Sequence, residues 1–132
     1  MSLNEVKRTE RGWAGHFILS SRCRFRRNTL LEYGDIKIVV STIGNMFSIT
    51  NNGYEKYEQV GLKRDYETYV FFADNEDPYH DIIAERQLFE FDRAYEIKKG
   101  DKCCDLIANN MHEEVVAEVT EALLKGEIHN VE

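Results

Sequence analysis

The strongest constraint on the fold is a hairpin signal near residue 35. Two runs rich in apolar and β-branched residues, 29–33 and 36–42, flank the dipeptide Gly34-Asp35. Glycine at the first turn position favours a type II′ turn, which joins two antiparallel strands. The second run begins Ile36-Lys37-Ile38-Val39-Val40 and is the most strongly predicted strand of the chain. The sequence therefore predicts an antiparallel sheet.

Further strand candidates lie on both sides of this hairpin, at residues 15–19, 22–27, 65–73 and 82–91. Turn-forming residues within 48–53 predict a loop. The acidic stretch 74–81, which contains the only proline, predicts the connection of a second hairpin. Because no helical pattern separates the strands, parallel βαβ units are not expected.

The last segment predicts one helix. Apolar residues recur there at helical spacing, at Met111, Val115, Val119, Ala122 and Leu123. Asn110 and Glu113 match a capping box at its start, and Lys125-Gly126 matches a helix end. We therefore predict an α+β fold, in which a mostly antiparallel sheet curves into a half-open barrel or packs against one C-terminal amphipathic helix.

The length of 132 residues predicts a single domain covering residues 1–132, with residues 1–10 frayed. No apolar run is long enough for a membrane span, and the start of the chain does not read as a signal peptide. The three cysteines are an odd number, which favours reduced thiols in the cytoplasm. We therefore expect a cytoplasmic protein without a membrane partner.

Charge is distributed unevenly. Residues 7–27 carry seven basic and one acidic side chain, whereas residues 28–132 have a net charge of −12. In an extended strand, Arg22, Arg24 and Arg26 share one face, and Cys23 and Phe25 share the other. The guanidinium group matches carboxylates and phosphates with two parallel hydrogen bonds.

We therefore predict an anion-binding edge without catalytic activity. Its residues are Trp13, His16, Arg22, Arg24, Arg26, Arg27 and Asn28. The partner would be an acidic protein patch, a phosphate-bearing ligand or nucleic acid, in which case the rings stack on bases. The alternative is that the arginines pair with the acidic body or with a second subunit, and we expect a homo-oligomer, most simply a homodimer.

Two other functions stay open. The first is a small hydrolase that uses Cys23 with His16, or a metal bound by the acidic loop 74–81. The loop does not match an EF-hand, because Tyr79 stands where that motif needs glycine. The second is a structural homodimer subunit whose arginines clamp the partner copy.

His112-Glu113 approaches a zinc-protease motif, but the position of the second histidine is Val116. Cys103 and Cys104 also lack a partner pair with zinc-site spacing. We therefore predict neither a metal site nor a cofactor.

Three segments carry a resemblance: Arg11–Ile18, Cys23–Leu30 and Val39–Thr42. They resemble small uncharacterised bacterial and phage proteins of unknown function. The resemblance implies a bacterial or phage origin and a cytoplasmic setting, and it carries no activity and no catalytic residue.

Overall fold

The structure is a computed structural model that describes residues 5–11, 23–49, 52–53, 55–77, 81–98, 100–101 and 104–129. Of residues 24, 45–49, 55–58 and 104 it describes the backbone. The elements are β1 (Lys7–Arg11), β2 (Cys23–Tyr33), β3 (Ile36–Ile49), β4 (Glu55–Glu58), β5 (Tyr66–Ala73), β6 (Ile82–Gln87), the 3₁₀ helix η2 (Phe89–Phe91), β7 (Arg93–Tyr95) and α1 (Cys104–Leu124).

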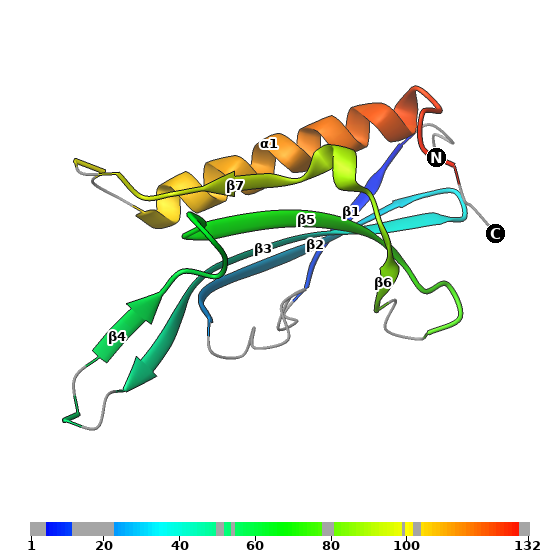
Figure 1. The fold of residues 1–132 in the computed structure, drawn as a ribbon. Helices are drawn as coiled ribbons and strands as arrows, with labels where there is room; N and C mark the ends of the chain where they lie inside the picture. The colour runs from blue at the N-terminus through cyan, green and yellow to red at the C-terminus, as the bar shows by residue number, and fades with distance from the viewer. Residues whose placement is uncertain are drawn as a thin grey trace.

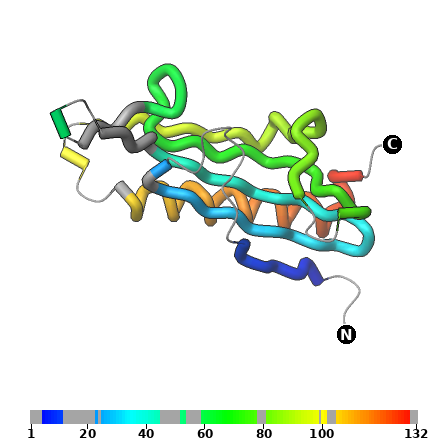
Figure 2. Tube along the Cα trace, turned by 90° about the horizontal axis from the view of Figure 1, so that it is seen from below, coloured from blue at the N-terminus to red at the C-terminus, as the bar shows by residue number. Residues whose placement is uncertain are grey.

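The strands form one antiparallel sheet in the order β1-β2-β3-β5-β6, and α1 lies along one face of it (Figure 1). β4 extends the sheet from the far end of β3, and β7 pairs with the first residues of β5. Seen from below, the central strands run along the helix (Figure 2). The described strands β1 and β6 are the two outer strands and do not pair with each other, so the sheet is open. The predicted α+β fold with an antiparallel sheet and one C-terminal helix is confirmed.

The hairpin at Gly34-Asp35 is confirmed, and both of its strands are longer than predicted. Gly34 has φ 61° and Asp35 does not have a positive φ, which is the pattern of a type II′ turn. The predicted strands 22–27 and 29–33 form one strand, because the register between β2 and β3 is constant from Tyr33↔Ile36 to Cys23↔Met46. Residues 48–49, which we expected in a loop, belong to β3, and the predicted strand 15–19 lies outside the described residues.

Three further predicted boundaries were wrong. The strand predicted over residues 82–91 ends at Gln87, and residues 89–91 form η2. Residues 7–10 are not frayed, since β1 pairs with β2 from Lys7↔Glu32 to Arg11↔Asn28. The helix begins at Cys104, so Asn110 lies inside it and is not its N-cap. The additional turns pack Ala108 against the sheet, a tertiary contact that overrides the local capping pattern.

The C-terminal end of α1 agrees with the prediction. Gly126 has φ 74°, its N–H donates to the Leu123 carbonyl, and the Glu127 N–H donates to the Ala122 carbonyl. These two bonds form a Schellman motif, which turns the chain back and buries Ile128.

The main core lies between the sheet and α1. Leu31, Ile38, Val40 and Val70 point to the helix and meet its residues Val115, Val119 and Leu123. Leu30, Val39 and Ala73 form a smaller cluster on the opposite face of the sheet. Residues of β2 and β3 are therefore buried on both faces of the sheet, with successive residues facing opposite sides.

The described part of the chain has no helix that is both long enough and apolar enough to cross a lipid bilayer.

We predict that Gly44→Ala destabilises the fold by about 1–3 kcal/mol, because the ring of Tyr66 lies where the new Cβ would stand. Urea unfolding followed by circular dichroism measures the effect. Gly61→Ala is the matched control, because its Cβ would meet only the flexible Arg64 side chain, at 3.2 Å. Equal unfolding midpoints for the two variants would contradict this packing.

Candidate functional site

The predicted anion-binding edge is only partly visible. Trp13, His16 and Arg22 lie outside the described residues, and for Arg24 only the strand backbone is described. Arg26 is exposed, on the face of β2 opposite to the helix.

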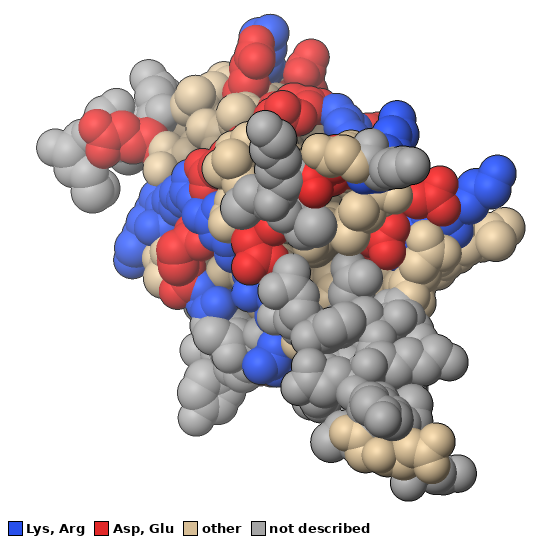
Figure 3. Space-filling view, turned by 90° about the vertical axis from the view of Figure 1, so that its left-hand side faces the viewer, with Lys and Arg blue, Asp and Glu red and all other residues tan. Residues whose placement is uncertain are grey.

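Two of the predicted residues do not belong to an open edge. Asn28 is 1% exposed and lies in the interior of the sheet. Arg27 points to the helix side, where it contacts Glu10 and Glu113. Alternation along β2 explains the position of Arg27, because adjacent residues of a strand face opposite sides. Asn28 shares the face of Arg26 but is buried between its neighbouring strands β1 and β3. In the view of Figure 3, Lys and Arg side chains lie beside Asp and Glu and do not form one large basic patch.

Arg27 belongs to an ion-pair cluster that we define as Arg8, Glu10, Arg27 and Glu113. Glu113 receives Arg8 Nη1 at 2.9 Å and Arg27 Nη2 at 2.5 Å. Glu10 receives Arg27 Nε at 3.0 Å and Arg8 Nε at 3.1 Å. The cluster therefore joins β1, β2 and α1, three elements far apart in the sequence.

The cluster keeps both carboxylates ionised. The hydrogen bond from Arg8, aided by Arg27, lowers the pKa of Glu113 to about 2. Burial raises the pKa of Glu10, but hydrogen bonds from Thr29, Arg27 and Arg8 outweigh burial and hold this pKa below its ordinary value. The two arginines are thus committed to partners within the same chain.

A chain of buried hydrogen bonds continues from Glu10 into the core. Thr29 Oγ1 donates to Glu10 at 2.8 Å and lies 2.7 Å from His112 Nε2. The other ring nitrogen, Nδ1, lies 2.7 Å from Thr42 Oγ1, which is 2.6 Å from Thr68 Oγ1. His112 is 0% exposed, so both of its nitrogens have their partners inside the protein.

The ionised carboxylate of Glu10 can only accept hydrogen bonds, and this fixes which group donates and which accepts along the rest of the hydrogen-bond chain. Since Thr29 gives its hydroxyl proton to Glu10, its oxygen accepts from His112 Nε2–H. Nδ1 then accepts from the Thr42 hydroxyl, which in turn accepts from Thr68. Burial, together with the nearby Arg27 charge, lowers the pKa of His112 to about 4, so the imidazole is neutral at pH 7. With no free nitrogen and no access to solvent, it cannot serve a substrate as a base.

The described parts of the proposed enzyme sites have no catalytic geometry. Cys23 is 6% exposed between Ile43 and Val60, and burial raises the pKa of its thiol, which keeps it protonated. Its proposed partner His16 lies outside the described residues. Val116, at the position where a zinc motif needs histidine, is buried in the apolar core.

The described residues of the acidic loop 74–81 also have no catalytic geometry. Asp74 accepts the backbone N–H of Glu76, and Asp81 accepts that of Ile82, as turn residues do. Residues 78–80, including His80, are not among the described ones. Across the described residues, no three His, Cys, Asp or Glu side chains gather in a way that would hold a metal ion.

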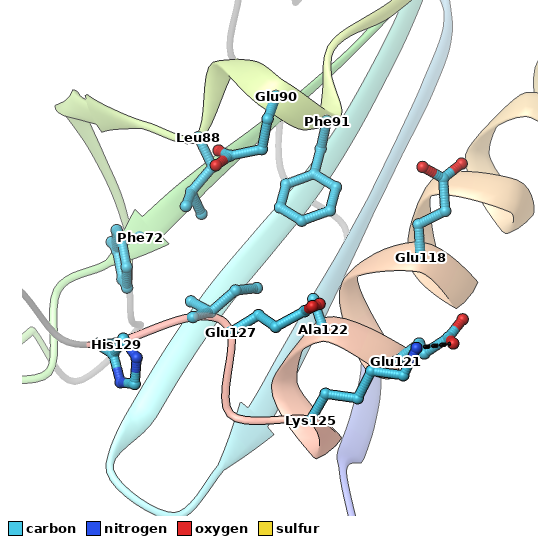
Figure 4. A pocket seen from close by; sticks show the side chains of 11 residues that line it. Phe72, Leu88, Glu90, Phe91, Glu118, Glu121, Ala122, Lys125, Glu127 and His129 are labelled. Atoms are coloured by element: carbon cyan, nitrogen blue, oxygen red, sulfur yellow. Dashed lines mark ion pairs between the residues drawn. The ribbon is translucent and has the colours of Figure 1, made fainter.

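A cavity of about 570 Å³ opens between β5, η2 and the C-terminal end of α1 (Figure 4). Its apolar walls are Phe72, Leu88, Phe91, Ala122 and Ile128. Its charged and polar residues are Glu90, Glu118, Glu121, Lys125, Glu127 and His129. We call it the α1-end cavity. No sequence pattern predicts this cavity, because residues from 72 to 129 meet there only after the strands have paired and α1 has packed on them.

The hydrogen-bond chain through His112 was also not predicted from the sequence. The available signal was a histidine next to the apolar helical positions, together with inward-facing threonines in three strands. That signal becomes specific only once the register places Thr29, Thr42 and Thr68 next to one another.

Together these features define an α+β protein whose C-terminal α-helix is anchored to an antiparallel sheet by an apolar core and a buried polar chain. Comparison with protein families, curated proteins and solved structures finds no match to this chain. The resemblance to small bacterial and phage proteins therefore stays a prediction, and function is argued from the residues themselves.

We predict that acid destabilises the fold through His112. The unfolded chain takes up this proton near pH 6.5 and the folded protein only near pH 4, so stability is lost as the pH falls between these values. The full loss is on the order of 3 kcal/mol. Glu10 and Glu113, whose pKa values are lowered from 4.5, add their losses only below about that pH.

Urea unfolding between pH 7 and 4.5 measures this dependence. His112→Gln should be less stable at pH 7 and should show a flatter dependence, whereas His129→Gln, at an exposed position, should retain the wild-type slope. An NMR titration of the wild type gives an independent check. A His112 that titrates near pH 6.5 in the folded protein would contradict the assignment.

Proposed function

We propose that this protein is a binding module without catalytic activity, and that it binds an anionic partner through the outward arginines of β2. The observation that carries the proposal is the contrast between Arg26 and its neighbour Arg27. Arg27 is held by Glu10 and Glu113, whereas Arg26 is exposed and has no ion pair with another described residue.

Other basic residues of the sheet are committed in the same way as Arg27. Arg8 pairs with Glu113, and Arg93 with Glu118. By the sequence pattern, Arg22 and Arg24 share the face of Arg26. A short row of guanidinium groups on the face of β2 away from the helix would match a carboxylate or phosphate group.

The absence of catalysis is supported by the state of two reactive side chains. His112 uses both ring nitrogens internally, and the thiol of Cys23 is buried with a raised pKa. The free, buried Cys23 also supports the cytoplasmic setting that we propose. In one version of the proposal, the anionic partner is a second copy of the protein. These arginines then contact acidic groups of the second copy, and the protein is a homodimer.

The acidic remainder of the chain limits the strength of such binding. A net charge of −7 repels a polyanion at long range, so the arginine contacts act at short range and weaken with salt. We therefore expect modest affinity that depends on ionic strength.

We predict that Arg26→Gln weakens binding of a fluorescently labelled heparin oligosaccharide several-fold and lowers the salt dependence by about one ion. Fluorescence anisotropy at 20 to 200 mM salt measures both quantities. Lys7→Gln removes the same charge at the far end of the β1–β2 pair, where its side chain is 74% exposed, and should have little effect. Equal losses in the two variants, or no binding by the wild type at low salt, would overturn the proposal.

A further inference from the structure

The α1-end cavity is a second, separate place where a ligand fits. It lies on the helix side of the sheet, whereas Arg26 faces the other side. The register pairs Phe72 with Ile38 and Arg26 with Ile43, so the two places are five residues apart along β3, about 16 Å. A ligand in this cavity would not touch the arginines of β2.

The inner surface of the cavity is apolar and well supported. Phe72, Ala122 and Ile128 are buried members of the main core, and Leu88 and Phe91 are half-buried against it. The Schellman motif at Gly126 brings Ile128 back toward the sheet. A volume of about 570 Å³ is in the range of small-molecule sites, which hold mostly apolar walls and a few polar groups.

The polar groups at this cavity are mainly carboxylates. Glu118 is paired with Arg93, and Glu121 is paired with Lys125. Glu90 and Glu127 have no ion pair with a described residue. Figure 4 shows Glu127 reaching across the space toward Ala122, with Glu90 above it on η2. Two carboxylates thus stand at an apolar cavity. Glu127 interacts with the charge of Lys125, which is already paired with Glu121.

The Phe72 ring of the aromatic wall already has a cation over one face. The guanidinium carbon of Arg86 lies 4.6 Å from the centre of the Phe72 ring, so this ring already interacts with a cation. Phe89, the central residue of η2, is 71% exposed and extends the apolar surface beside the cavity.

From these observations we propose that the α1-end cavity binds an organic cation with a compact apolar body. The apolar body fills the space between Phe72, Leu88 and Phe91, and the ammonium group lies near Glu90 and Glu127. A bare metal ion would gain nothing from the apolar walls, and an organic anion would be repelled by the carboxylates. The charge complementarity and the cavity size together select this ligand class.

The test uses three probes of nearly equal shape and different charge: 3-phenylpropylamine, 3-phenylpropan-1-ol and 3-phenylpropionate. Binding to the full chain is measured at pH 7 by isothermal titration calorimetry and by amide chemical-shift changes. We expect the amine to bind several-fold more tightly than the alcohol, the acid to bind most weakly, and the shifts to centre on residues 88–91 and 118–129.

A double variant, Glu90→Gln with Glu127→Gln, should reduce the affinity for the amine about five- to ten-fold and leave the alcohol unchanged. Both side chains are exposed, so the fold should tolerate the change. Glu96→Gln is the matched control, because Glu96 is an exposed carboxylate that does not line the cavity. It should leave the amine affinity as in the wild type.

Equal affinities for the three probes in the wild type would overturn the proposal, as would the absence of amine binding up to 5 mM. An unchanged amine affinity in the double variant would also overturn it. The charge series on the wild type does not depend on the folding of any variant. Neither result involves Arg26, so this proposal and the anion-binding proposal fail separately.

Discussion

The position of His112 in the interior is the constraint on which the rest of the structure depends. An imidazole between a helix and a sheet must find a hydrogen-bond partner for each ring nitrogen, because a buried polar atom without one costs free energy. Thr29 and Thr42 supply those partners from β2 and β3, and Thr68 continues the chain into β5. A one-residue slip in either pairing would turn a threonine to the opposite face of the sheet. The polar chain therefore specifies the register of three central strands and the position of α1 on them.

The hydrogen-bond chain through His112 also explains why the arginines within residues 7–27 divide between the two faces of the sheet. Glu10 ends the hydrogen-bond chain at the surface, and Arg8 and Arg27 pair with its carboxylate while also holding Glu113 of the helix. Part of the positive charge of residues 7–27 therefore neutralises the chain itself. Arg26 points to the other face and has no ion pair with a described residue, which is why the proposed function depends on this side of the sheet alone.

The α1-end cavity follows from the way the helix ends. α1 stops at Leu124, and the Schellman motif turns the following residues toward the sheet before they leave the core. η2 stands opposite, after β6 has ended, so the two segments enclose a space above Phe72 that neither fills. Two candidate binding places of opposite charge preference thus lie on opposite faces of one sheet.

The sequence by itself determined the features that depend on near neighbours: the II′ turn at Gly34-Asp35, the hairpin between β5 and β6, the apolar face of α1 and its glycine stop. These follow from local backbone geometry and from alternation or helical spacing of apolar residues. Only the tertiary structure decided that Lys7–Arg11 forms a strand, that α1 starts at Cys104, that Arg27 faces the helix and Asn28 is buried, and that the α1-end cavity exists. In each of these cases the stabilising partner is distant in the sequence, such as Glu113 for Arg8 or Tyr66 for Ala108, and no local pattern contains it.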